Sequence, residues 1–309
     1  MDTVPFSCTR ARHRVVEVNG LPLHLLEWGS SGSPGLCFLH GGSAHAHWFD
    51  AVAPAFADRF HVVSLDQRGH GESAWPAAPA YATEDFAGDL EGVLDALGWR
   101  EAVIAGHSMG GHNAMAFAAW QPARVRALVI VDSRPALPAD RLHVMHARGH
   151  RPTRRHASRA DGVARFRLLP RDTVADPALL AHMAEVGLAE REGGWVFRFD
   201  PQCNGARRPV DAWPLLGRIE APTLIVRAEL SPVLPRDMAE RLRAAIPWSS
   251  LVEIPGAYHH VTLDRPELVT AALDDFLRGL GAPLPRESQR TPIASGKASM
   301  AESSDSGAA

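Results

Sequence analysis

One short stretch, residues 102–111, sets the strongest limit on how this 309-residue chain can fold. It reads AVIAGHSMGG, in which an apolar run typical of a buried parallel strand leads into a helical pattern that begins just after Ser108. Gly106 and Gly110 stand two residues before and two residues after this serine. A serine on a sharp strand-to-helix turn takes strained backbone angles, so small residues are needed on both sides of it. The stretch therefore predicts a raised Ser108 hydroxyl beside the Met109 amide, which can donate to a developing negative charge.

Together with three further motifs, this stretch resembles the α/β-hydrolase superfamily, in its serine-nucleophile, esterase-like branch. The resemblance covers roughly residues 12–281, and its other motifs are HGG at 40–42, DQRGHGES at 66–73 and GAYH at 256–259. It implies a mostly parallel eight-stranded sheet with helices on both faces and an inserted helical lid. It also implies that the Gly42 amide is a second oxyanion donor beside that of Met109. By the same resemblance, the charged 66–73 loop is a structural turn, and His40 supports its own loop.

Strand and helix patterns alternate along the chain, which favours a mostly parallel sheet with its site at the carboxyl ends of the strands. An Asn19-Gly20 hairpin is expected near the start, and Thr83 is expected to cap a helix. Apolar runs predict strands at residues 15–18, 23–26, 36–39, 62–65, 102–105, 127–132, 223–226 and 251–254.

The alternation is interrupted once, which divides the chain into expected parts. Residues 1–133 and 213–282 are expected to form the α/β-hydrolase core. The helical and proline-containing segment 134–212 is expected to be a lid inserted over the site. Residues 283–309 lack aromatic side chains and are rich in serine and alanine, so a disordered tail is expected there.

A serine hydroxyl needs a general base, and the base needs a carboxylate that orients it. In the resembled family the order along the chain is serine, acid, histidine. His259 stands where the family carries its base, and the adjacent His260 is the alternative. The family's usual glycine before this histidine is replaced here by Tyr258.

The acid is the point at which this chain departs from the family pattern. The family's commonest acid position corresponds to Ser231, and a serine cannot hold a charge opposite an imidazolium. Two carboxylates can substitute: Asp132, at the end of an expected strand, and Glu229, two residues before Ser231. Asp132 is preferred because its strand leads straight to the rim of the site.

Four further side chains are expected to bind substrate: Trp48, His107, Trp195 and Tyr258. Trp195 alternates with Phe197 and Phe199, which predicts a short extended segment that contributes apolar surface. The pair His45-x-His47 raises the question of a metal. No third ligand pattern stands nearby in the sequence. Neither a metal nor a cofactor is therefore expected, and this pair is expected to line the pocket or cap the next helix.

Composition excludes several other classes of function. The net charge of −3 gives no global basic field for nucleic acid, and three cysteines make no disulfide framework. No stretch reaches the length of a membrane span, so a cytoplasmic setting without membrane contact is expected. Nine arginines and one acid lie between Arg141 and Arg171. They form either an electropositive rim for an anionic substrate or a solvated helix face.

The sequence thus predicts a cofactor-independent serine hydrolase that cleaves a small carboxylic ester or lactone through an acyl-enzyme. The same apparatus serves amide or carbon–carbon bond hydrolysis. A non-catalytic ligand-binding relative is the alternative class, and Ser231 is the feature that favours it. Ser108 argues against the haloalkane dehalogenases and epoxide hydrolases of the superfamily, which carry aspartate at this position.

Overall fold

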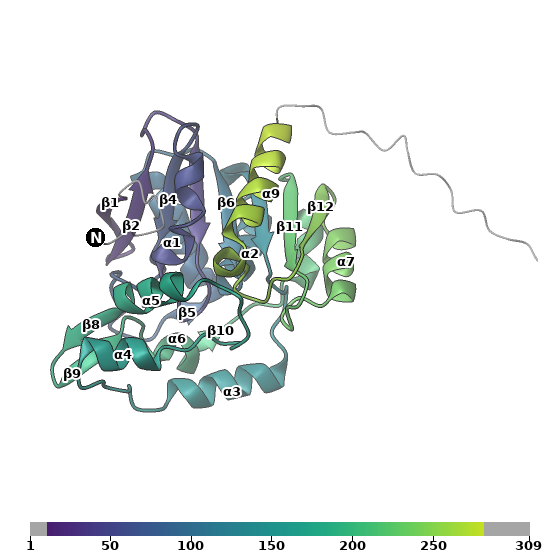
Figure 1. Cartoon of the computed structure of the whole chain (residues 1–309). Helices are drawn as coiled ribbons and strands as arrows, with labels where there is room; N and C mark the ends of the chain where they lie inside the picture. Colours follow the sequence, from purple (N-terminus) through teal and green to yellow (C-terminus); the bar gives the residue numbers. More distant parts are fainter. Residues whose placement is uncertain (1–10, 281–309) are drawn as a thin grey trace, which may run out of the picture.

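The computed structural model describes residues 11–280, and its centre is one eight-stranded sheet (Figure 1). The strand order is β1-β2-β4-β3-β6-β7-β11-β12. Strand β2 runs antiparallel to both of its neighbours, and the other neighbouring pairs are parallel. The predicted fold class is therefore confirmed. The bounds are β1 Arg12–Val18, β2 Leu21–Trp28, β3 Gly35–Leu39, β4 His61–Leu65, β6 Ala102–His107, β7 Val125–Val131, β11 Thr223–Ala228 and β12 Ser249–Ile254.

The hairpin between β1 and β2 is confirmed. Val18 pairs with Leu21, so Asn19 and Gly20 alone make the turn. Their φ angles are 52° and 74°, the left-handed values that a two-residue hairpin turn requires and that asparagine and glycine accept most readily.

Helices cover both faces of the sheet, and a large apolar core lies on each face. One core packs α1 (Thr83–Ala96), α2 (Met109–Trp120) and α7 (Arg236–Ala245) on the sheet. The other packs the 3-10 helices η1 (Ala46–Phe49) and η2 (Ala53–Phe56) with α8 (Val261–Asp264) and α9 (Pro266–Gly279). The prediction that Thr83 caps α1 is wrong: Ala82 stands at the cap, and Asp85 accepts the Ala82 amide at 2.8 Å.

Residues 134–212, called the insertion below, lie together beyond one end of the sheet in Figure 1. They carry α3 (Ala139–Gly149), α4 (Arg159–Arg165), α5 (Pro177–Val186), β8 (Leu188–Arg191), β9 (Gly194–Phe197), α6 (Gln202–Gly205) and β10 (Arg207–Arg208). Leu168, Leu179 and Met183 of the insertion join the core around η1. The insertion starts directly after β7, so it covers the edge where the parallel strands end.

Arg207 fixes the end of the insertion to the core. Strand β10 pairs with β5 (Tyr81–Ala82), and Arg207 is only 1% exposed. Its guanidinium donates to Asn113 Oδ1 at 2.8 Å and to the Tyr81 carbonyl at 3.3 Å, and it lies 4.7 Å from the centre of the Phe86 ring. Burial lowers the pKa of Arg207 to about 10.

Within residues 11–280 no helix is long and apolar enough to cross a membrane. Cys37 and Cys203 are free and buried in this part of the chain. The predicted tail at 283–309 lies outside the described residues.

Candidate active site

Ser108 occupies the sharp turn between β6 and α2, with φ 52° and ψ −116°. Crowding explains the glycines on both sides of it. A Cβ at Gly106 would lie 2.4 Å from the Gly110 carbonyl, and one at Gly110 would lie 2.2 Å from the Leu39 carbonyl oxygen. Such contacts are too short for any side chain, so the close packing of strand, turn and helix requires glycine at both positions. The turn leaves Ser108 half-buried at the strand end.

Three side chains that are far apart in the sequence meet at this turn. The Ser108 hydroxyl lies 3.0 Å from His259 Nε2, within donating distance. On the other side of the ring, His259 Nδ1 donates to Asp132 Oδ2 at 2.7 Å. Asp132 follows β7 and has no exposed surface, and His259 lies in the loop after β12. This chain of contacts allows proton transfer from the hydroxyl to the ring while a carboxylate fixes the ring's orientation.

Asp132 receives two further hydrogen bonds besides that of His259. The Ser231 hydroxyl donates to its Oδ2 at 2.5 Å, and the Ala228 amide donates to its Oδ1 at 3.1 Å. Ser231 stands at the position where the resembled family commonly carries its acid. Here it donates a hydrogen bond to the carboxylate, which Asp132 supplies instead. The other candidate acid, Glu229, is exposed and accepts the Gly256 amide at 2.7 Å, so the structure does not bring it to His259.

The HGG loop after β3 lies against the same turn. A Cβ at Gly41 would lie 3.2 Å from Ser108 Cβ, and one at Gly42 would lie 3.8 Å from Met109 Sδ. Met109 is the first residue of α2, where a backbone amide has no partner within the helix. Gly41 thus lies against Ser108, and Gly42 lies beside Met109, the residue that follows the serine.

His40 holds the HGG loop in place from inside the protein. Its Nε2 accepts the Gln67 amide at 3.0 Å, and its Nδ1 donates to the Gly41 carbonyl at 2.7 Å. Burial lowers the pKa of His40 to about 3, so the ring is neutral and can accept at one nitrogen. The Gln67 side chain also donates to the His40 carbonyl at 2.7 Å and accepts from Asn113 at 2.9 Å.

Two more histidines lie beside His259 without touching the serine hydroxyl. His107 donates from Nε2 to the His259 carbonyl at 2.8 Å, and the two ring centres are 4.8 Å apart. Burial, together with the neighbouring His259 and His260, lowers the pKa of His107 well below its usual value. His260 donates to the Pro170 carbonyl of the insertion at 3.1 Å, so it faces away from Ser108.

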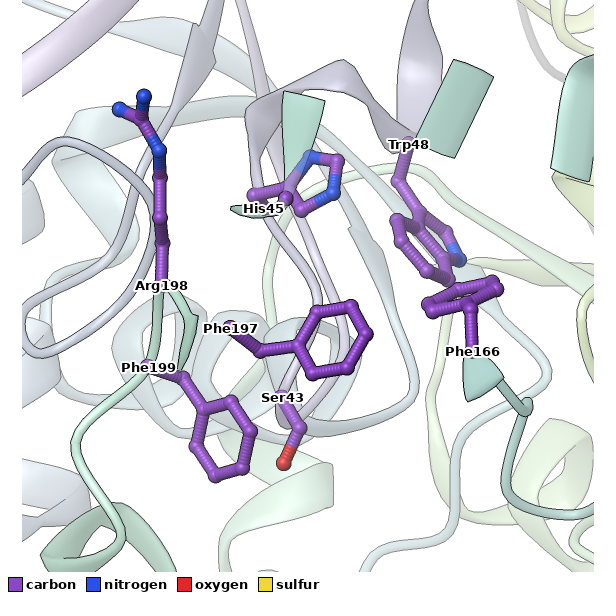
Figure 2. Close-up of a pocket in the computed structure, with 8 residues that line it drawn as sticks. Ser43, His45, Trp48, Phe166, Phe197, Arg198 and Phe199 are labelled. Carbon is purple, nitrogen blue, oxygen red and sulfur yellow. The ribbon is translucent and has the colours of Figure 1, made fainter. Parts of the chain in front are cut away.

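A small cavity between the insertion and the HGG loop has a volume of about 10 Å³, about enough for one water molecule. Figure 2 shows three phenylalanine rings from the insertion facing the segment that follows β3. The lining residues are Ser43, His45, Trp48, Phe166, Gly187, Phe197, Arg198 and Phe199. Trp48 also lies 6.2 Å, ring centre to ring centre, from His260, and His260 lies 5.0 Å from His259.

Only some of the residues that were expected to bind substrate line this cavity. Trp48 lines the cavity, whereas Trp195 does not: Phe197 and Phe199, the other members of its alternation, do so in its place. Trp195 pairs with Glu190 in the β8–β9 hairpin. Tyr258 lies next to His259 and donates its amide to Asp264 Oδ2 at 2.8 Å.

The arginine-rich segment does not line this cavity. All nine arginines between Arg141 and Arg171 are exposed. The arginine at the cavity is Arg198 instead, and it donates to Glu72 Oε1 at 2.6 Å. Sequence reasoning missed Arg198 and Phe166, because they come from separate parts of an irregular segment.

His45 lines the cavity, as one reading of the His45-x-His47 pair expected. It donates from Nε2 to the Met183 carbonyl at 3.1 Å. No side-chain hydrogen bond caps η1 at His45. The sequence near His47 shows no third metal-ligand pattern, yet the structure brings Asp50 and His182 to this side chain.

Comparison with known proteins shows the family to which this fold belongs. Residues 34–159 match the family model described as the alpha/beta hydrolase fold. The chain is 28% identical to the 2-(acetamidomethylene)succinate hydrolase of Mesorhizobium japonicum over 85% of this chain and 94% of that protein. It is 30% identical to epoxide hydrolase A of Mycobacterium tuberculosis over 86% of this chain and 97% of that one.

A solved structure gives the same result at the level of the fold. The crystal structure of an E-2-(acetamidomethylene)succinate hydrolase matches with a TM-score of 0.78 and 28% identity, over 87% of this chain and all of that one. These relatives are hydrolases, and the match extends well beyond the residues around Ser108. This chain therefore belongs to the α/β-hydrolase superfamily.

Proposed function

We propose that this protein is a cofactor-independent serine hydrolase that cleaves a carboxylic ester or lactone through an acyl-enzyme. One observation carries the proposal: a hydroxyl on a strained turn lies 3.0 Å from His259 Nε2, while His259 Nδ1 lies 2.7 Å from Asp132. A strained nucleophile, a base and an orienting carboxylate in this order are the parts that acyl transfer needs.

In the proposed reaction, Ser108 attacks the substrate carbonyl while His259 Nε2 takes its proton. Asp132 holds the ring in the tautomer that can accept this proton and stabilises the imidazolium that forms. The Gly42 and Met109 amides donate to the oxyanion. His259 then protonates the leaving alcohol, and a water that it deprotonates cleaves the acyl-enzyme.

The aromatic character of the nearby cavity would suit a compact apolar or aromatic part of a substrate, once the cavity is widened. Its lining contains Trp48 and three phenylalanines. A volume of about 10 Å³ is far below that of a small-molecule site. The insertion would therefore have to move before substrate enters, as the lid expected from the sequence would do. The cytoplasmic location expected from the sequence stays a prediction.

Amide hydrolysis is the second candidate reaction. The solved relative with the TM-score of 0.78 is a hydrolase of E-2-(acetamidomethylene)succinate, a compound whose name contains an acetamido group. The same serine, histidine and oxyanion donors would serve an amide, with His259 protonating a leaving nitrogen in place of an oxygen.

Two measurements test the proposal. A fluorophosphonate probe is expected to label the wild-type protein at Ser108 and to leave Ser108→Ala unlabelled. A panel of p-nitrophenyl esters of increasing acyl length, run beside lactones and an N-acetyl enamide, then separates the reactions. Labelling without turnover of any of these would favour another acyl substrate or carbon–carbon bond cleavage. An unreactive serine in the folded protein would favour the non-catalytic binding class.

A further inference from the structure

Outside the proposed active site, two histidines and an aspartate converge where the insertion meets the core. His47 lies on η1, Asp50 directly follows that helix, and His182 lies on α5 of the insertion. His47 Nδ1 and His182 Nε2 each donate to Asp50 Oδ2 at 2.8 Å. One ligand atom from each residue lies within 4.8 Å of the other two.

These three atoms are the ligand types that zinc takes in proteins, namely two imidazole nitrogens and a carboxylate oxygen. Zinc bonds of about 2.0–2.1 Å in a tetrahedron place neighbouring ligand atoms roughly 3.3 Å apart. The present nitrogen–oxygen separations of 2.8 Å are therefore about half an ångström too short. A small outward movement of Asp50 Oδ2 would make room for an ion among the three.

Burial and charge at this place suit a cation that keeps a bound water. The Asp50 side chain is 11% exposed, against 22% for His47 and 39% for His182. Asp50 Oδ2 accepts a hydrogen bond from each of the two histidines, as an ionised carboxylate does. The more exposed His182 side leaves access for the ion and for a fourth ligand from solvent.

We propose that His47, Asp50 and His182 form a binding site for one divalent transition-metal ion, with Zn²⁺ as the best fit. The ion would take the place of the two bridging N–H groups, and each neutral imidazole would carry its proton on its other ring nitrogen, Nε2 of His47 and Nδ1 of His182. Because the ligands come from η1 and from α5, it would tie the insertion to the core. His45, which lies two residues before His47, lines the cavity and binds the Met183 carbonyl on α5. The ion would therefore stabilise the closed arrangement around the cavity.

A second histidine group nearby is less suitable and serves as a control. His13, His24 and Glu72 also lie close together, and the His13 ring centre is 6.3 Å from that of His47. Glu72, however, is already paired with Arg198 at 2.6 Å, so an ion there would have to compete with a guanidinium for the carboxylate.

The test titrates Zn²⁺ into the full chain, with any affinity tag removed and bound metal stripped by a chelator. Calorimetry is expected to find one Zn²⁺ per chain whose affinity falls at least about tenfold in His182→Ala and in His47→Ala. Co²⁺ in place of Zn²⁺ is expected to give the visible absorption of a four-coordinate site, and both variants should lose it. Zinc at 100 times its Kd should raise the Tm of the wild type by roughly 5 °C.

Two matched variants decide where any ion binds. His143→Ala removes an exposed histidine from another helix of the insertion, and His13→Ala disrupts the second group; both are expected to keep wild-type affinity. Unchanged Zn²⁺ affinity in His182→Ala and His47→Ala, or a loss confined to His13→Ala, would overturn the proposal. So would the absence of measurable binding to the wild type. The Tm of each variant without metal checks that it is folded.

Discussion

Asp66 and Asp132 are two buried aspartates in closely similar surroundings, and only one of them lies at the proposed active site. Asp66 follows β4 and accepts from His24 Nδ1 at 2.8 Å, whereas Asp132 follows β7 and accepts from His259 Nδ1 at 2.7 Å. Each also accepts two more hydrogen bonds. Those of Asp66 come from the Ala46 and Glu72 amides.

The two pairs differ in what lies beyond the histidine. The far nitrogen of His259 faces Ser108 Oγ, on a strained turn at the start of α2. The far nitrogen of His24 lies 2.9 Å from His13 Nδ1 instead. Both pairs are thus built alike within residues 11–280, and we expect reactivity only where the histidine faces a serine hydroxyl.

The largest effect on kcat is expected from a change in the His259–Asp132 pair beside Ser108. Asp132→Asn should lower kcat about 10⁴-fold, because the amide no longer holds His259 in the accepting tautomer. Glu229→Gln is the matched control and should keep near-full turnover, since Glu229 contacts Gly256 rather than the histidine. Steady-state kinetics on the best ester of the panel measures both. A Glu229→Gln enzyme that loses turnover while Asp132→Asn retains it would reverse the assignment of the acid.

The same change at the other pair should affect stability instead of chemistry. Asp66→Asn replaces a charged acceptor of several hydrogen bonds, so the free energy of unfolding should fall by about 2–3 kcal/mol. Thermal unfolding should show a Tm lower by roughly 4–12 °C, while kcat per folded molecule stays near that of the wild type. If Asp66→Asn unfolds like the wild type but has lost kcat, the contrast drawn between the two pairs is wrong.

The Asp66 pair also predicts a pH dependence of stability. Burial alone would raise the pKa of Asp66, but the hydrogen bond and charge of His24, with further help from the Glu72 amide, lower it below the usual value. Its stabilising effect is then fully present above the pKa of the unfolded chain, about 4, and is lost as pH falls through the lower folded value. Denaturant unfolding at pH 7 and at pH 3 should show the gap between wild type and Asp66→Asn narrowing in acid. A constant gap would contradict this.

The smallest effect is expected from the hydroxyl that supports the acid. Ser231→Ala removes one donor to Asp132, which should cost about tenfold in kcat, or roughly 1.4 kcal/mol. The double variant Asp132→Asn with Ser231→Asp sharpens the comparison, because it moves the carboxylate to the position that the family commonly uses. Recovery of part of the lost kcat would show that either position can orient His259. If Ser231→Ala costs as much as Asp132→Asn, the serine has a larger role than hydrogen bonding to the acid.

The sequence predicts best those parts that local chemistry decides. The 102–111 stretch itself forms a strand, a turn and the start of a helix, because glycines and a buried apolar run leave few alternatives. Asn19-Gly20 gave the hairpin for the same reason. Thr83 does not cap α1 because it is the first residue of the helix, and its hydroxyl accepts the Val210 amide of a distant segment at 3.1 Å instead, a contact that residue preferences alone do not predict.

Contacts across long separations in the sequence are harder to predict. The sequence leaves both Asp132 and Glu229 as candidates for the acid, because only the folded sheet determines which carboxylate reaches the histidine. The sequence around His47 shows no third metal ligand, because that ligand of the proposed site is His182, which lies 132 residues from Asp50 along the chain. Trp195 and Phe197 share an alternation, but the twist and docking of a short hairpin decide which of them lines the cavity.

Arg207 has a consequence for engineering this enzyme. Its guanidinium is buried beneath α2, and its hydrogen bonds go to an amide oxygen and a carbonyl. Cutting out residues 134–212 would leave Asn113 and the Tyr81 carbonyl without this donor in the protein interior. The insertion is thus no detachable module. A graft of the corresponding segment from a relative would succeed only if it also supplied a cation at this place, or if Asn113 and its neighbours were redesigned along with it.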